Sequence, residues 1–199
     1  MHCAKNKTKE KNMNIICCHG VMSPEQDWNT RTYNELKGWK NWLQFYAEFE
    51  HDVLVQLPRF PHAHAALMKY SEWEKIMDKQ DINPDTVLIG HSAGGGFVLK
   101  YMSLHPEIKV KQIVLVAPWL DIENFQPFGF YKGTDLTKDI VSQTKLGVDL
   151  MYSDDDDSYI LSSCDAIIKN MPKVNVHKFA DRGHFVTPQL PEIMQIIKF

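Results

Sequence analysis

Short apolar runs alternate with amphipathic segments along most of the chain. The runs are rich in Val, Ile and Leu and have the length of strands; they lie at 14–20, 52–57, 85–90, 111–119, 148–153 and 175–180. The segments between them favour helices, with apolar residues recurring every three or four positions; they lie at 33–50, 65–79, 93–105, 159–170 and 188–198. Strands that are apolar on both faces are typical of a parallel sheet covered by helices on both sides. The pattern therefore predicts an α/β fold, a three-layer α/β/α sandwich with a mainly parallel sheet of about six strands.

The rhythm is interrupted by one long irregular segment, at 120–145, which is rich in aromatic residues, Gly and Asp. Neither an internal repeat nor a low-complexity linker divides the chain, so we expect a single domain at 13–199. The polar residues 1–12 are interpreted as a disordered extension rather than a signal peptide, because no long apolar stretch follows them. Met13 is an equally good start of translation.

Composition and charge exclude several classes of function. The formal net charge is −3 and no basic stripe is interleaved with aromatic residues, which argues against a nucleic-acid partner. No apolar stretch is long enough for a membrane span. The four cysteines show no C-x-x-C pairing, and Cys17 and Cys18 are neighbours on a predicted strand. This usage favours buried free thiols in a reducing cytoplasm.

The most informative motif is G-x-S-x-G at 90–94, between a predicted strand and a predicted helix. A sharp strand-to-helix turn exposes the hydroxyl of Ser92 to a substrate carbonyl but crowds the neighbouring residues. Glycine at 90 and 94 removes the side chains that would collide there. Two other interpretations are weaker: close helix–strand packing alone, and a phosphate loop, for which no dinucleotide or Walker pattern is present. We therefore predict that Ser92 is a nucleophile.

A neutral serine needs a general base and an acid that orients the base. In this type of fold the acid and then the histidine follow the serine along the chain. His184 comes after the last predicted strand, next to a glycine, and is the predicted base. The acid is expected in the run of aspartates at 154–157, after the fifth strand, with the other aspartates facing water or capping the next helix. The run lacks the ligand spacing and the glycine of a calcium loop.

Backbone N–H groups complete the predicted site. His-Gly follows directly after the first core strand, so the N–H groups of Val21 and Ala93 are the expected oxyanion-hole donors. His62 and His64 form only a weak metal signal, because no carboxylate accompanies them. His91 precedes the nucleophile on the turn itself, which is the wrong position for a base.

With these residues in place, the chain resembles the retinoblastoma-binding protein 9-like (YdeN-type) family of small serine hydrolases, in the α/β-hydrolase superfamily. The matching motifs are "HG…SP", "GWKNWL", "LPRFP" before the Trp of "YSEW", "GHSAGG", "LVAPW" and "GHF". The resemblance covers nearly everything after Met13. It implies a compact fold without a large cap, so that 120–145 would shield the site only in part.

The resemblance also implies a catalytic set of Ser92, His184 and an aspartate from an S-x-x-D-P-[YF]-[VL] motif. The sequence "SDDDDSYI" departs from that motif by one extra residue and by Ser in place of Pro. Alignment on the residues downstream selects Asp157, whereas counting from Ser153 selects Asp156. Asp157 is preferred, on the argument that the downstream residues set where the loop turns.

The expected function is therefore hydrolysis of a small acyl ester through an acyl-enzyme, with Ser92, His184 and Asp157 as the triad. No cofactor or metal is needed, and a small-molecule acyl compound is the expected partner. An acyl pocket and core packing are equally good interpretations of the aromatic residues, which are Trp119, Phe128, Phe130 and Tyr131. Alternatives are a thioesterase or amidase on the same triad, or a binding protein on a hydrolase scaffold.

Overall fold

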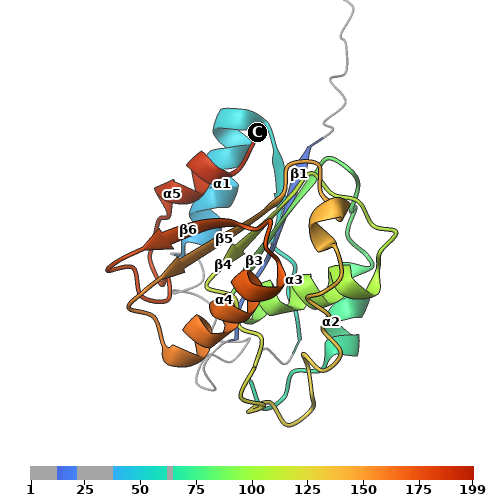
Figure 1. Cartoon of the computed structure of the whole chain (residues 1–199). Coiled ribbons are helices and arrows are strands. Elements are labelled where there is room, and N and C mark those ends of the chain that lie inside the picture. Colours follow the sequence, from blue (N-terminus) through green and yellow to red (C-terminus); the bar gives the residue numbers. More distant parts are fainter. Residues whose placement is uncertain (1–12, 22–37, 62–64) are drawn as a thin grey trace, which may run out of the picture.

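The six strands formed by the described residues make one parallel sheet, in the order β2-β1-β3-β4-β5-β6 (Figure 1). The computed structural model describes residues 13–21, 38–61 and 65–199. The strands are β1 (Asn14–Cys18), β2 (Leu54–Gln56), β3 (Thr86–His91), β4 (Gln112–Val116), β5 (Val148–Ser153) and β6 (Asn175–Phe179). β1, β3 and β4 are buried at every position, which is why the middle of each strand is an uninterrupted apolar run.

Helices cover both faces of the sheet. They are α1 (Trp39–His51), α2 (Tyr70–Met77), α3 (Ala93–Leu104), α4 (Ser158–Asn170) and α5 (Pro191–Ile196). Figure 1 shows α1 and α5 together on one side of the sheet and α2, α3 and α4 on the other. The predicted three-layer α/β/α sandwich is confirmed. None of the helices formed by the described residues is long and apolar enough to cross a membrane.

The strand register brings distant parts of the sequence to one edge of the sheet. Cys18 pairs with Gly90, His91 with Val116, and Ser153 with Phe179, so the strands end together at their carboxyl ends. The order of the strands reverses direction between β1 and β3, and open α/β sheets bind ligands outside the carboxyl ends at such a point. The loops after β1, β3, β5 and β6 therefore meet where a site is expected.

The predicted elements agree with the observed ones apart from their ends. Strand β5 has the predicted limits, whereas β1 ends at Cys18 and α5 occupies only part of 188–198. Within 120–145 the chain forms turns and one short 3-10 helix, η1 (Ile140–Gln143). The predicted extension at 1–12 lies outside the described residues.

The irregular segment 120–145 is fastened to the body of the protein. The buried ammonium group of Lys100 on α3 donates hydrogen bonds to the carbonyls of Phe130 (2.7 Å) and Lys132 (2.8 Å). The carboxylate of Asp121 accepts the N–H groups of Phe125 (2.7 Å) and Gln126 (2.9 Å). These bonds satisfy backbone groups that a segment without regular structure would otherwise leave unpaired.

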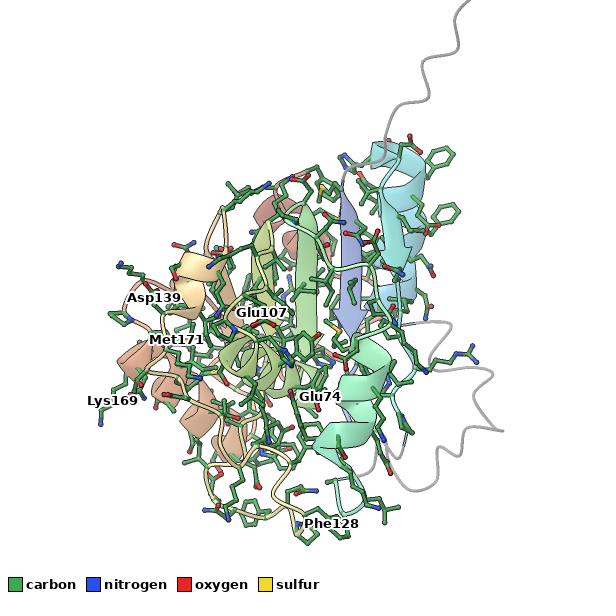
Figure 2. All side chains as sticks on the ribbon, turned by 90° about the vertical axis from the view of Figure 1, so that its right-hand side faces the viewer. Glu74, Glu107, Phe128, Asp139, Lys169 and Met171 are labelled. Atoms are coloured by element: carbon green, nitrogen blue, oxygen red, sulfur yellow. The ribbon has the colours of Figure 1, made fainter. Side chains whose placement is uncertain are left out.

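The aromatic residues of this region divide between core and surface. Phe130, Tyr131 and Trp119 belong to the hydrophobic core, which favours packing over an acyl pocket for these three. Phe128 is 56% exposed and lies at the tip of the segment, at the end of the molecule toward which β1 runs (Figure 2).

Candidate active site

Ser92 occupies a strained turn between β3 and α3. Its φ of 55° and ψ of −123° are a backbone conformation that residues with a Cβ rarely adopt. Backbone hydrogen bonds hold the turn: Ser92 N–H donates to the carbonyl of Val116 (2.9 Å), and the Ser92 carbonyl accepts from Trp119 and Gly95 (both 2.9 Å) and more weakly from Gly96 (3.4 Å). The strain is thus maintained by β4 and by the first turn of α3, as expected for a preorganised functional residue.

Glycine is required around Ser92 because the backbones approach closely. A Cβ at Gly90 would lie 2.6 Å from the carbonyl oxygen of Gly94, and one at Gly94 would lie 2.4 Å from that of Cys18. At Gly96 a Cβ would lie 2.0 Å from the carbonyl oxygen of Trp119. The small residues therefore serve both the tight turn and the close packing of α3 against the strand ends, two explanations that are not exclusive.

His184 lies on the loop after β6, on a backbone that contains several left-handed residues. Asp181, Gly183 and Phe185 all have positive φ. The buried Phe185 anchors the loop by edge-on packing against Phe179, with ring centroids 5.7 Å apart. The imidazole of His184 itself remains 27% exposed.

The acid that contacts His184 is Asp156. Its carboxylate oxygens lie 2.9 Å and 3.1 Å from Nδ1 of His184, and its side chain is only 1% exposed. Asp157 instead accepts a hydrogen bond from the Tyr159 hydroxyl (3.1 Å). The expectation that Asp157 faces His184 is therefore wrong. The reason is local: the end of β5 determines where the loop begins to turn, so that counting from Ser153 selects the aspartate that contacts His184.

The four aspartates after β5 have separate roles, which explains how so many like charges coexist. Asp154 pairs with Lys178 of β6 (3.3 Å). Asp155 accepts hydrogen bonds from the Ser153 hydroxyl and from the N–H of Gly183 (3.0 Å), next to His184, and these bonds lower the pKa of Asp155. Asp157 is the N-cap residue of α4, but its side chain makes no capping bond and is exposed to water.

His91 joins the nucleophile turn to the histidine loop. Its Nε2 lies 2.9 Å from the backbone carbonyl of His184, and the two imidazole centroids are 5.1 Å apart. This contact brings His184 beside the residue that directly precedes Ser92. None of the hydrogen bonds among the described residues joins the Ser92 hydroxyl to the His184 ring; in enzymes this contact is often longer than a hydrogen bond until substrate binds.

The loop after β1 lies directly against Ser92. A Cβ at Gly20 would lie 2.8 Å from Cβ and 3.3 Å from Oγ of Ser92, so only glycine fits. Ala93 begins α3, and the first N–H groups of a helix have no carbonyl one turn earlier. The predicted donors Val21 and Ala93 thus belong to the two backbone segments that flank Ser92.

His19 is a functional candidate that the sequence analysis missed. Its Nε2 accepts the N–H of Phe60 (3.1 Å), so its Nδ1 carries the proton that it donates to the carbonyl of Gly20 (2.8 Å). The carbonyl and the N–H of a trans peptide point in opposite directions, so this bond fixes the direction of the Val21 N–H. The only signal in the sequence is the His-Gly pair after the first strand. It predicts the backbone donor at Val21 but gives no role to the His19 side chain.

The motif "LPRFP…YSEW" surrounds this histidine. Phe60 and Trp73 pack against the His19 ring, with centroids 5.3 Å and 5.6 Å away, and stack on each other at 4.5 Å. The indole N–H of Trp73 donates to the carbonyl of Pro61 (2.9 Å). The motif therefore holds the loop that flanks the nucleophile.

The remaining reactive side chains do not form a second site among the described residues. Cys17, Cys18 and Cys164 are free and buried, and burial raises the pKa of Cys17 and of Cys164 to about 12, so both thiols are neutral. No cluster of His, Cys, Asp or Glu that could hold a metal ion occurs in the part of the chain that the structure describes. His62 and His64 lie outside that part.

Comparison with known proteins identifies the family of this chain. Residues 61–187, more than half of the chain, match the model of the serine aminopeptidase S33 hydrolase family. The chain belongs to this family. The S33 match contains both Ser92 and His184, together with the aspartates between them.

Solved structures show how widely the fold is shared. The ydeN gene product of Bacillus subtilis is 16% identical, with a TM-score of 0.75 over 92% of this chain and 96% of that one. Est1E from Butyrivibrio proteoclasticus is 13% identical, with a TM-score of 0.59 over 96% and 87%. A predicted hydrolase from Thermoplasma acidophilum is 15% identical, with a TM-score of 0.60 over 94% and 84%. This S33 protein therefore has a compact α/β-hydrolase fold like that of the ydeN gene product, as its motifs predicted.

Proposed function

We propose that this α/β-hydrolase cleaves small acyl esters with Ser92 as nucleophile, His184 as general base and Asp156 as the orienting acid. One observation carries the proposal: the buried Asp156 carboxylate engages Nδ1 of His184 beside the strained turn that bears Ser92. With Nδ1 bonded to the carboxylate, Nε2 is the ring nitrogen available to accept the serine proton.

The reaction follows from these roles. Ser92 Oγ attacks the ester carbonyl while His184 takes its proton, and the imidazolium is stabilised by the Asp156 carboxylate. His184 then protonates the departing alkoxide, leaving an acyl group on Ser92. Water, deprotonated by the same imidazole, releases the acid and regenerates the serine.

The N–H groups of Val21 and Ala93 are the proposed donors to the oxyanion. Two observations support this: the backbone of Gly20, next to Val21, lies close against the Ser92 side chain, and Ala93 is the first residue of α3. One such donor typically contributes about 3 kcal/mol to transition-state stabilisation. Because the Gly20 carbonyl is held by His19, the Val21 N–H of the same peptide is already oriented and needs little reorganisation during the reaction.

Hydrolysis of an amide or peptide bond is the second candidate, favoured by the serine aminopeptidase description of the family. An aminopeptidase also needs an anionic group to bind the substrate's α-ammonium. The four aspartates after β5 already have partners within the protein, so we assign none of them to a substrate ammonium. Thioester cleavage would also begin with attack of Ser92 on the acyl carbonyl, so thioesters are compared with esters and amides in the second experiment.

The first experiment asks whether the site is catalytic. We expect a fluorophosphonate probe to label the wild type rapidly, and Ser92→Ala to abolish the label. His184→Ala should slow labelling by orders of magnitude with the fold intact, because a nucleophile and its base act as a unit. A folded wild type that is neither labelled nor able to turn over an ester is a binding protein on a hydrolase scaffold, and the proposal is then wrong.

The second experiment compares acyl groups matched in chain length on three leaving groups: p-nitrophenol, a thiol and p-nitroaniline. We expect the highest kcat/KM for the oxygen ester. A higher value for aminoacyl p-nitroanilides would establish the amidase instead. Ser92→Ala, which removes every one of these activities if they share the site, is the control.

A further inference from the structure

His91 makes two hydrogen bonds that determine its protonation state. Its Nε2 faces the carbonyl of His184 at 2.9 Å, and a carbonyl only accepts, so Nε2 carries a proton. Its Nδ1 faces Nζ of Lys40 at 3.0 Å, and an ammonium only donates, so Nδ1 must be unprotonated. The ring is therefore a neutral tautomer that bridges the first turn of α1 to the backbone of the histidine loop.

The first turn of α1 holds the histidine loop at a second point. The N–H of Trp39 donates to the carbonyl of Thr187 (3.0 Å), and the Trp39 ring packs edge-on against His91, with centroids 5.8 Å apart. The loop is thus fastened to α1 directly at Thr187, and through His91 at His184.

The loop needs such restraint because its backbone is unfavourable on its own. Gly183 and Phe185 flank His184 and both have left-handed φ values, of 49° and 54°. A phenylalanine in that region is held only by its surroundings. Asp155 and Asp156 restrain the loop from the side of β5, and His91 restrains it from the side of α1.

We propose that His91 and Lys40 are positioning residues for His184: Lys40 selects the tautomer of His91 that donates to the His184 carbonyl, and this bond keeps the imidazole aligned with Ser92. The inference rests on the proposed Ser92–His184 chemistry and adds to it two residues that do not touch the reacting atoms.

The charges around His91 agree with this role. Burial, and then the positive charge of Lys40, lower the pKa of His91; His184 and His19 are the other titratable groups that act on it. A neutral His91 has a further benefit. When His184 takes up the serine proton, no second imidazolium lies 5.1 Å away to oppose it.

The kinetic test compares His91→Leu, which removes both hydrogen bonds, with His91→Gln, whose amide N–H can still donate near the position of Nε2. We expect His91→Leu to lower kcat for an ester about 30-fold with KM little changed, because a small misplacement of a catalytic group costs up to about 100-fold. His91→Gln should recover most of this loss. Equal losses in the two variants, or a change confined to KM, would contradict the proposal.

Lys40→Met tests the tautomer step. It should lower kcat by less than His91→Leu does, and the double variant should be no slower than His91→Leu alone, since the proposed role of Lys40 in positioning His184 runs through His91. Additive losses would overturn this link. Lys145→Met, which removes an exposed lysine paired with Asp85, is the matched control and should retain wild-type kinetics.

A spectroscopic test does not depend on activity or on the folding of a variant. In ¹⁵N spectra of the wild type, His91 should show a protonated Nε2 and an unprotonated Nδ1 that do not titrate as the pH passes through about 6.5, the pKa of an unperturbed histidine. Titration of this ring, or the opposite tautomer, would refute the bridge.

Failure of this inference is distinguishable from failure of the proposed function. An inactive, unlabelled wild type refutes both. An active wild type whose His91→Leu variant turns over ester at the wild-type rate refutes only the positioning role.

Discussion

Asp156 lies against the imidazole of His184, whereas its neighbour Asp157 turns toward Tyr159. The two carboxylates are adjacent in the sequence but differ in burial: the Asp156 side chain is 1% exposed, and Asp157 is exposed. The Asp157 N–H also donates to the Asp156 carboxylate (2.7 Å), which helps hold that group in place. One position along the chain therefore separates the proposed orienting acid from a surface residue.

Replacing these two residues by asparagine should have very different effects. Asp156→Asn should lower kcat by up to about 10⁴-fold, because an amide no longer selects the reactive imidazole tautomer. Asp157→Asn should remain close to wild type, because the Tyr159 hydroxyl can still donate to the amide oxygen. Both variants should be compared on the same ester, with thermal melts to show that the folds are intact.

The opposite ranking, a nearly inactive Asp157→Asn beside an active Asp156→Asn, would mean that the loop rearranges during catalysis. It would also restore the assignment that alignment on the downstream residues favoured.

His19 should affect kcat through the oxyanion hole. His19→Leu removes the bond to the Gly20 carbonyl and frees the Gly20–Val21 peptide to rotate. We expect a loss in kcat of about 10- to 100-fold, somewhat less than deletion of an oxyanion donor. KM should change little, because the oxyanion forms only in the transition state.

The matched variant is His19→Asn, whose side-chain amide can still donate near the position of Nδ1. It should be faster than His19→Leu at equal thermal stability. If the two variants are equally slow, packing against Phe60 and Trp73 accounts for the effect, and His19 has no role in orienting the peptide.

Gly94→Ala should destabilise the fold as well as the site. The added Cβ would meet the carbonyl oxygens of Cys18 (2.4 Å) and His19 (2.6 Å), both backbone atoms that cannot rotate away. Overpacking of this kind costs about 1–3 kcal/mol. For a chain of this size it should lower Tm by roughly 2 to 12 °C. An unchanged Tm would mean that α3 moves away from β1 at little cost.

Asp155 should make the stability of the protein depend on pH below neutrality. Hydrogen bonds from Ser153 and Gly183 lower its pKa in the folded state, so its contribution is fully present above the unfolded pKa of about 3.9 and is lost as pH falls through the lower folded value. Asp155→Asn should therefore have a lower Tm than wild type at pH 7, and the gap should close in strong acid. The gap should be modest because the group is exposed.

Asp165→Asn, at an exposed position on α4, controls for the loss of one negative charge in the same experiment. A gap between wild type and Asp155→Asn that stays unchanged in strong acid, where Asp155 is protonated in the folded protein too, would contradict the role assigned to Asp155.

The pattern of the sequence was sufficient where a single local rule decides the outcome. Continuous apolar runs give buried parallel strands whatever surrounds them, and G-x-S-x-G between a strand and a helix predicts the turn at Ser92, because few residues tolerate its crowding. His184 followed from its place after the last strand. These inferences depend only on neighbours along the chain.

The choice between Asp156 and Asp157 depended instead on the direction in which the loop after β5 points each successive side chain. The same is true of His19 and His91, whose partners, Phe60 and Lys40, lie about forty to fifty residues away in the sequence. No pattern within one segment encodes such pairings.

The sequence alone determined which strands and helices form and proposed Ser92 and His184 for the chemistry, because periodicity and turn chemistry act over a few residues. Tertiary structure decided which of several equivalent groups face one another. Packing brings together loops that are remote along the chain, and the direction of a single peptide or carboxylate depends on all of them at once.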